Sequence, residues 1–142
     1  SQIHISNTEK ILRRFIIDLY DNDIFFLKKH FKQIWNDMEI TAERNRKKIS
    51  QIKVETELDN ADLGHLIMML ENKESKKRAK EKKAEAFEDL ITKIAIVNEK
   101  RNRVDHSRGV SEGELPINEK MVLVGHCSEI DQFCDECTLK WV

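Results

Sequence analysis

The chain has 142 residues, a length typical of one domain spanning 1–142. Hydrophobic residues make up 39% and charged residues 36%, and the 4 Gly and 1 Pro are too few for the turns of a β-sandwich or barrel. The 25 Lys and Arg nearly balance the 26 Asp and Glu. A net charge of −1 excludes a general attraction to nucleic acid, so any basic site must be local.

The N-terminal half predicts two helices. Ser6 and Glu9 have the spacing of a capping box, which predicts a first helix that begins there and runs to about Asp21. After a break at Asn22-Asp23, apolar residues at helical spacing predict a second amphipathic helix over about 26–38. Two helices joined by a short break are expected to form an antiparallel hairpin.

The middle of the chain is harder to interpret. Residues 49–62 have weak periodicity and are predicted to be loop, followed by a short helix over 63–72 with Asp59 or Asn60 as its cap. Seven basic residues then oppose two acidic ones over 73–83. This basic run suits a helical extension or a solvated loop equally well, and it is either a solvated face or an RNA contact.

The last third predicts two long helices. The clearest apolar stripe of the chain begins at Phe87 and continues at helical spacing to about Val104, and Gly109 supplies a stop. A polar loop over 109–116 precedes a final helix that begins near Ile117 or Asn118. The sequence therefore predicts an all-α, up-and-down bundle of four to five helices.

Nothing in the sequence predicts a membrane protein or an exported one. The apolar runs are far shorter than the ~20 residues that cross a bilayer. The first residues lack the basic and apolar regions of a signal peptide. Three cysteines near the end of the chain fit reduced thiols, so a cytoplasmic location is expected.

The end of the strongest helix concentrates groups that can act on a phosphate. Asn102 and His106 are four residues apart and share a helix face, whereas Arg101 is about 140° from His106 and reaches the same place by its length. Imidazole can take a proton from a ribose 2′-hydroxyl or give one to a leaving oxygen, and guanidinium can stabilise charge on the phosphate. Ordinary surface residues at a helix end are the competing interpretation.

Arg101-Asn102 and His106 resemble the Arg-x4–6-His motif of the HEPN superfamily, and Leu63-Gly64-His65-Leu66-Ile67 resembles a helix that precedes the motif in several branches. The resemblance spans roughly residues 58–110. It implies a helical bundle, a metal-independent ribonuclease of a toxin–antitoxin or antiviral defence system, and Arg101, His106 and Asn102 as catalytic residues. It also implies a homodimer that pairs two motifs, and an antitoxin or defence-complex partner.

This chain departs from the family pattern at two positions. One branch of the superfamily, which a partner nucleotidyltransferase adenylylates, has a Tyr two residues after the His, where this chain has Arg108. The small apolar residue that usually precedes the His is Asp105 in this chain. We expect Lys100, Arg103 and Arg108 to contact the RNA, and no cofactor is indicated. The alternatives are a non-catalytic HEPN-like module that binds nucleotide, RNA or a partner protein, and a plain helical interaction module.

Other conspicuous residues are interpreted as structural. Cys127, Cys134 and Cys137 lie near His126, and the Cys-x2-Cys spacing suits metal, but a helical pattern without a second pair favours packing in the core. Histidines 30 and 65 are expected to be structural or exposed. Trp35 and Trp141 are expected to be core or interface anchors, and the apolar end Trp141-Val142 favours a homodimer.

Overall fold

The computed structural model describes residues 2–48, 57–106 and 116–142, with side chains over 3–44, 58–102 and 116–142. The described residues form helices only, which confirms the all-α class, although the helices outnumber the predicted four to five. They are α1 (Gln2–Leu19), α2 (Ile24–His30), α3 (Lys32–Lys48), the 3-10 helix η1 (Glu57–Asn60), α4 (Leu63–Glu71), α5 (Lys73–Glu81), α6 (Phe87–His106) and α7 (Ile117–Lys140).

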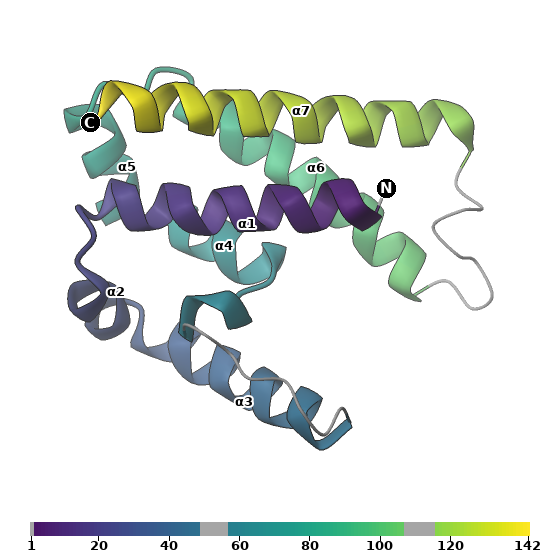
Figure 1. Ribbon diagram of the computed structural model, residues 1–142, viewed down its shortest axis with the longest axis horizontal. Helices are drawn as coiled ribbons and strands as arrows, with labels where there is room; N and C mark the ends of the chain where they lie inside the picture. Colours follow the sequence, from purple (N-terminus) through teal and green to yellow (C-terminus); the bar gives the residue numbers. More distant parts are fainter. Residues whose placement is uncertain (1, 49–56, 107–115) are drawn as a thin grey trace.

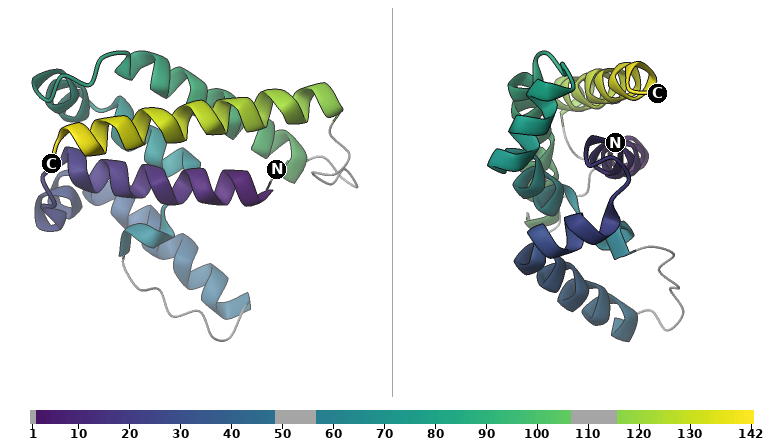
Figure 2. Two further views of the ribbon diagram at one scale, coloured as in Figure 1. Left: turned by 45° about the horizontal axis from the view of Figure 1, so that its top comes forward. Right: turned by 90° about the vertical axis from the view of Figure 1, so that its left-hand side faces the viewer.

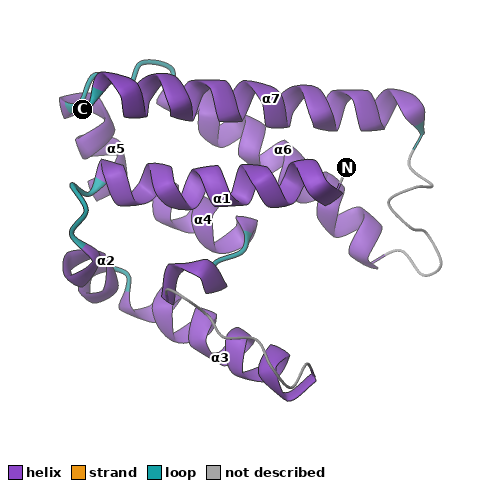
Figure 3. Cartoon of the chain, in the orientation of Figure 1, coloured by secondary structure: helices purple, strands orange, loops and turns teal. Residues whose placement is uncertain are grey.

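Three long helices, α1, α6 and α7, form the main part of the bundle (Figure 1). α1 and α7 lie side by side and run in the same direction, and α6 runs the opposite way against α7. α4 packs between α1 and α6, and α3 projects from the other side of α4 and η1 (Figure 2). Short connections join most of these helices (Figure 3). None of the described helices is long and apolar enough to span a bilayer.

α1 begins at Gln2, so the predicted start at a Ser6 cap is wrong. The reason is packing: Ile5 is buried, one helical turn before Thr8 and two before Leu12, and these residues continue the buried stripe toward the N-terminus. Ser6 therefore lies inside the helix and is exposed. Glu9 does not cap a helix and is free to make other contacts.

The second predicted helix is two helices. α2 ends and α3 begins on either side of Phe31, whose φ of −104° and ψ of 39° are not helical. The apolar periodicity continues across this break, because Phe31 and Trp35 are both buried. The predicted hairpin is also wrong, since α1 packs on α7 and α4, while α3 packs on α2, η1 and α4.

The middle of the chain contains two capped helices. The residue that caps α4 is Asp62, whose side chain accepts from the His65 backbone N–H, and neither Asp59 nor Asn60 does so. The His65 ring is buried and completes the capping box, with Nε2 2.6 Å from Asp37 on α3. Asn72 caps α5, so the basic run is a helix of its own over 73–81. Of the predicted loop over 49–62, residues 49–56 lie outside the described part, and 57–60 form η1.

The last two helices agree with the sequence. α6 extends from Phe87 to His106, close to the predicted span, and α7 begins at Ile117 as predicted. Trp35 is in the core as expected. Trp141 packs on Phe15 at 5.3 Å between ring centroids, and its Nε1 donates to the Lys82 carbonyl. Trp141 therefore makes its contacts within its own chain, and its presence does not support a dimer.

Candidate active site

The candidate site lies where the buried stripe of α6 changes from apolar to polar side chains. Along the first three turns this stripe is apolar and buried, from Phe87 through Ile94 to Val97. The next residues on the same side are Asn98, Arg101 and Asn102, all half-buried. Polar side chains thus replace apolar ones at the C-terminal end of a helix that packs against α7.

Arg101 is held at this end by α1. Its Nη1 lies 4.0 Å from Oε2 of Glu9, and both side chains are largely buried, 19% and 12% exposed. The same Glu9 oxygen lies 3.5 Å from Nη2 of Arg13. Glu9 therefore stands between two guanidinium groups, one on its own helix and one from α6.

A second anchor fixes the position of Arg13. Its Nε and Nη2 donate to the carbonyl of Ala61 at 3.1 and 2.7 Å, so the guanidinium fork spans from α1 to the segment before α4. Burial raises the pKa of the Glu9 carboxyl, and the positive charges of Arg13 and then Arg101 partly offset that rise. The ion pairs of Glu9 and the hydrogen bonds of Arg13 together link α1, α6 and the segment before α4.

Thr8 ties the neighbouring position of α1 to α7. Its buried hydroxyl donates to Oδ1 of Asp131 at 2.9 Å. Burial raises the pKa of Asp131, while the Thr8 hydrogen bond lowers it. Consecutive residues Thr8 and Glu9 thus connect α1 to α7 and to α6, which fixes the three helices at the level of the site.

One buried acceptor at this level has no hydrogen-bond partner in the described part of the chain. It is Oδ1 of Asn98, one turn before Arg101 and Asn102 on α6. A buried carbonyl oxygen without a donor is costly in a protein interior, and it is a common feature of sites that bind a ligand or water. The polar end of the α6 stripe therefore includes one buried acceptor that no other described residue satisfies.

The structure describes only part of the predicted site. Arg101, Asn102 and Lys100 are described and all half-buried, in the last turns of α6. Arg103 and His106 belong to α6, but their side chains lie outside the described residues, as does Arg108 altogether. The proximity of His106 to Arg101 thus rests on their spacing along one helix.

Sequence reasoning missed Glu9, Arg13 and Asn98. Ser6 and Glu9 have the spacing of a capping box, whereas the i,i+4 spacing of Glu9 and Arg13 is the one that forms a contact in the structure. The buried position of Ile5, seven residues before Leu12, is the signal that places Glu9 inside a helix. No local signal links Glu9 to Arg101, since 92 residues separate them in sequence.

The cysteines of α7 pack in the core as predicted. Cys127, Cys134 and Cys137 are free and buried. Burial raises the pKa of Cys134 strongly and that of Cys137 as well, which keeps both as thiols. No group of three or more His, Cys, Asp or Glu side chains arranged for a metal ion occurs among the described residues.

Comparison with models of known protein families, with curated proteins and with solved structures finds no match to this chain.

Proposed function

We propose that this chain is a metal-independent endoribonuclease of a toxin–antitoxin or antiviral defence system. The observation that supports it best is the change of the α6 stripe from apolar to polar at Asn98, with Arg101 held there by Glu9. Together with the resemblance of Arg101-Asn102 and His106 to the HEPN motif, it favours a site over an ordinary helix end.

The proposed reaction needs one base, one acid and a cation. The ribose 2′-oxygen attacks the adjacent phosphorus while the P–O bond to the next nucleotide breaks, which leaves a 2′,3′-cyclic phosphate and a 5′-hydroxyl end. His106 removes the 2′-hydroxyl proton or protonates the leaving 5′-oxygen. Arg101 stabilises the negative charge that develops on the phosphate oxygens, and Asn102 helps to bind them.

The same proposal includes a homodimer and a partner. One Arg and one His per chain are few for both proton transfers, so a second copy that brings its own pair completes the site. Exposed apolar residues suited to that contact lie in the first turns of α7, at the end of the molecule where α6 also ends (Figure 1). They are Ile117, Met121 and Val122. An antitoxin or another defence protein would control the activity.

The test is cleavage of single-stranded RNA by wild type, His106→Ala and Arg101→Ala, with and without EDTA. Removal of a proton-transfer group or of charge stabilisation is expected to lower the rate by ~10²–10⁴. EDTA is expected to leave the wild-type rate unchanged, and the products should carry cyclic phosphate. Arg14→Ala is the matched control, because Arg14 is exposed on α1 and pairs only with Asp18 in the described part of the chain.

Two results contradict the proposal: loss of wild-type cleavage in EDTA, or an unchanged rate in His106→Ala. A wild type that cuts no RNA favours the second candidate, a non-catalytic module that binds nucleotide, RNA or a partner protein. The observation in its favour is the Glu9 carboxylate, which offsets part of the charge of Arg101. Binding measured without cleavage separates the two functions.

A further inference from the structure

The basic helix α5 and the turn that follows it form a second candidate site, remote from Arg101. Seven basic residues lie between 73 and 83, against Glu74 and Glu81. The structure divides these cations into two groups. One group holds the fold together, and the other faces solvent.

Arg78 and Lys82 belong to the structural group. Arg78 pairs with Glu74 at 2.9 Å and lies over the Tyr20 ring at 4.5 Å. Lys82 bonds to Asp21 at 2.5 Å and lies over the Trp141 ring at 5.2 Å. Both cations thus link the C-terminal part of α5 and its cap to the residues that follow α1 and α7.

The second group is exposed: Lys73, Lys76, Lys77 and Lys80 form a stripe along one side of α5, and Lys83 lies in the turn that follows. The stripe positions follow the i, i+3, i+4, i+7 spacing of one helix face, so neighbouring side chains begin about 5–6 Å apart. Lys76 pairs with Glu88 at 3.3 Å. Within the described residues, Lys73, Lys77 and Lys80 make no side-chain ion pair or hydrogen bond.

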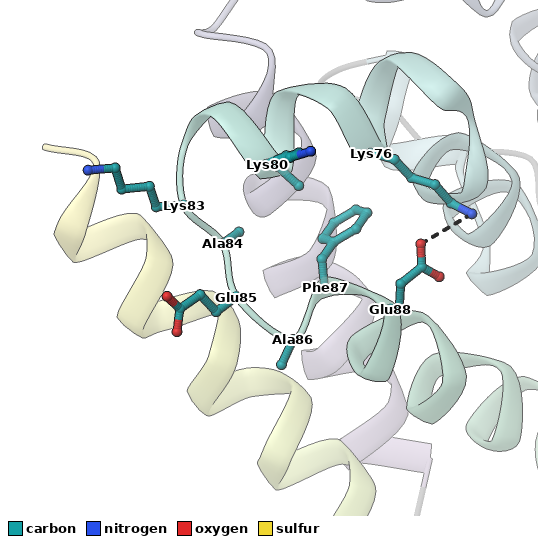
Figure 4. Close-up of a pocket in the computed structure, with 9 residues that line it drawn as sticks. Lys76, Lys80, Lys83, Ala84, Glu85, Ala86, Phe87 and Glu88 are labelled. Atoms are coloured by element: carbon teal, nitrogen blue, oxygen red, sulfur yellow. Dashed lines mark ion pairs between the residues drawn. The ribbon is translucent and has the colours of Figure 1, made fainter.

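A pocket opens beside the C-terminal half of this stripe (Figure 4). Its volume is about 540 Å³, and it lies between α5, the turn 82–86 and the start of α6. Buried Ala79, Ala84 and Phe87 give it an apolar floor. Figure 4 shows the Phe87 side chain pointing from the start of α6 toward α5, between Lys80 and Lys76.

The floor of the pocket is fixed by its own backbone and by the end of α7. Lys83 and Ala86 have φ values of 58° and 63°, in the left-handed region. The Ala84 N–H donates to the Ala79 carbonyl at 2.8 Å, and Lys140 and Trp141 donate to the carbonyls of Lys83 and Lys82. The turn is therefore held in an unusual conformation by contacts from two helices.

We propose that this face of α5 and the adjacent pocket bind single-stranded RNA. Backbone phosphates lie along the lysine stripe, and one unstacked base enters the pocket over Ala84 and Phe87. Regularly spaced ammonium groups beside an apolar recess suit a strand that offers both repeated phosphates and flat bases. A membrane is a poorer fit, because the exposed face of α5 carries no large apolar residue to insert.

This site goes beyond the proposed cleavage chemistry and does not depend on it. Phe87 and Arg101 are fourteen residues apart on α6, which is about 21 Å along the helix axis. Binding at α5 requires neither Arg101 nor His106. It would place RNA on the protein whether or not the chain cuts it.

The experiment measures the affinity of full-length protein for a fluorescent 12-nucleotide 2′-O-methyl oligouridylate between 50 and 300 mM NaCl. The 2′-O-methyl group removes the attacking hydroxyl, so cleavage does not affect the result. The test variant is Lys73→Gln/Lys77→Gln/Lys80→Gln. The control is Lys10→Gln/Lys29→Gln/Lys32→Gln, which removes the same charge from exposed positions elsewhere.

Log affinity falls as log salt rises, and for single strands each lost phosphate contact makes this negative slope shallower by about 0.7. The test variant is therefore expected to make the slope shallower by about 2. It should also weaken binding at least about tenfold at 100 mM NaCl, while the affinity of the control stays within about twofold of wild type. Glu85→Gln, which removes a carboxylate from the pocket, is expected to tighten binding. An oligomer of abasic residues should bind more weakly than oligouridylate.

Equal losses in the test and control variants would overturn the proposal, as would equal affinity for the abasic strand. Binding of polyglutamate or of anionic phosphatidylserine vesicles as tight as that of RNA would also overturn it, in favour of an acidic protein or a membrane. Circular dichroism checks that the triple variant is folded. The single variant Lys77→Gln provides an independent measurement, in which the negative salt slope is expected to be shallower by about 0.7.

Discussion

At the scale of single residues, Glu9 is the most informative side chain of the structure. It is buried beside two guanidinium groups, yet burial raises its pKa despite their charges. The folded chain therefore binds the Glu9 proton more tightly than the unfolded chain does. The stabilisation from that proton is complete below the ordinary value of 4.5 and is lost as the pH rises through the folded value.

We predict that the stability of wild type relative to Glu9→Gln is highest at low pH and falls as the pH rises. Gln keeps the shape of the side chain but does not titrate, so the difference isolates Glu9 from the other acids. Urea denaturation between pH 3.5 and 7 measures it, with exposed Glu39→Gln as the control. A difference that stays constant across this range contradicts the burial of Glu9.

Tyr20 and Ser75 form a buried chain of hydrogen bonds. The two hydroxyl oxygens lie 2.6 Å apart, and Ser75 donates to the Met69 carbonyl at 2.6 Å, so Tyr20 is the donor to Ser75. We predict that Tyr20→Phe lowers the free energy of unfolding by about 1 kcal/mol, because one hydrogen bond is lost. Ser75→Ala should lower it by up to about 3 kcal/mol, because the Tyr20 hydroxyl remains buried without its partner and the Met69 carbonyl keeps only the Asn72 N–H at 3.3 Å.

The double variant tests whether these groups act as one unit. Its loss of stability in urea is expected to be smaller than the sum of the two single losses. Ser6→Ala, at an exposed position in α1, is the control for a hydroxyl outside the chain of bonds. Strictly additive losses would show that the two hydroxyls contribute separately.

At the scale of elements, the sequence predicted the helices that have strong periodicity and clear boundaries. Phe87 begins a stripe that continues for ten residues, and Pro116 precedes α7, so both boundaries were correct. The start of α1 was missed because Ser6-Asn7-Thr8-Glu9 imitates a cap. The break at Phe31 was missed because a buried side chain keeps the helical pattern while its backbone leaves it.

The candidate site followed the same division. The placement of Arg101 and Asn102 together at the end of α6 could be predicted, because both lie on one strongly periodic helix. Glu9 could not be predicted, because its contact with Arg101 joins helices far apart in the chain. The sequence left the basic run over 73–83 undecided between a solvated face and an RNA contact, and it gave no sign that some of these cations anchor the fold. The distinction depends on partners such as Asp21 and Tyr20.

The turn after α5 supplies a prediction at this scale. Lys83 ends the helix with a φ of 58°, a conformation that Gly adopts at little cost. We predict that Lys83→Gly raises the free energy of unfolding by about 0.5–1 kcal/mol. Lys77→Gly, in the interior of α5, should instead lower it by about 1 kcal/mol. Thermal and urea denaturation compare the two, and a loss of stability in both would contradict the strain at Lys83.

At the scale of the whole molecule, the end where α6 stops and α7 starts is the predicted dimer interface. Ile117 and Met121 are 78% and 70% exposed and lie one helical turn apart. We predict a homodimer with a mass twice 16.8 kDa, and a shift to monomer in Ile117→Asp/Met121→Asp. Light scattering at micromolar concentration measures both.

The control for this prediction is Leu139→Asp, which places the same charge at an exposed apolar residue near the other end of α7. It should leave the mass unchanged. A wild-type mass of one chain removes the composite site, and a dimer that both variants disrupt equally would place the contact elsewhere.

The parallel pairing of α1 and α7 has a consequence during synthesis. About a hundred residues separate the end of α1 from the start of its main partner. At 5–20 residues per second, the ribosome needs roughly 5–20 s to make that stretch. Throughout this time, Phe15 on α1 lacks the Phe133 and Trp141 rings that pack on it in the finished fold. The nascent chain therefore presents an apolar helix for seconds before it can close, which makes it a natural client for chaperones that act at the ribosome.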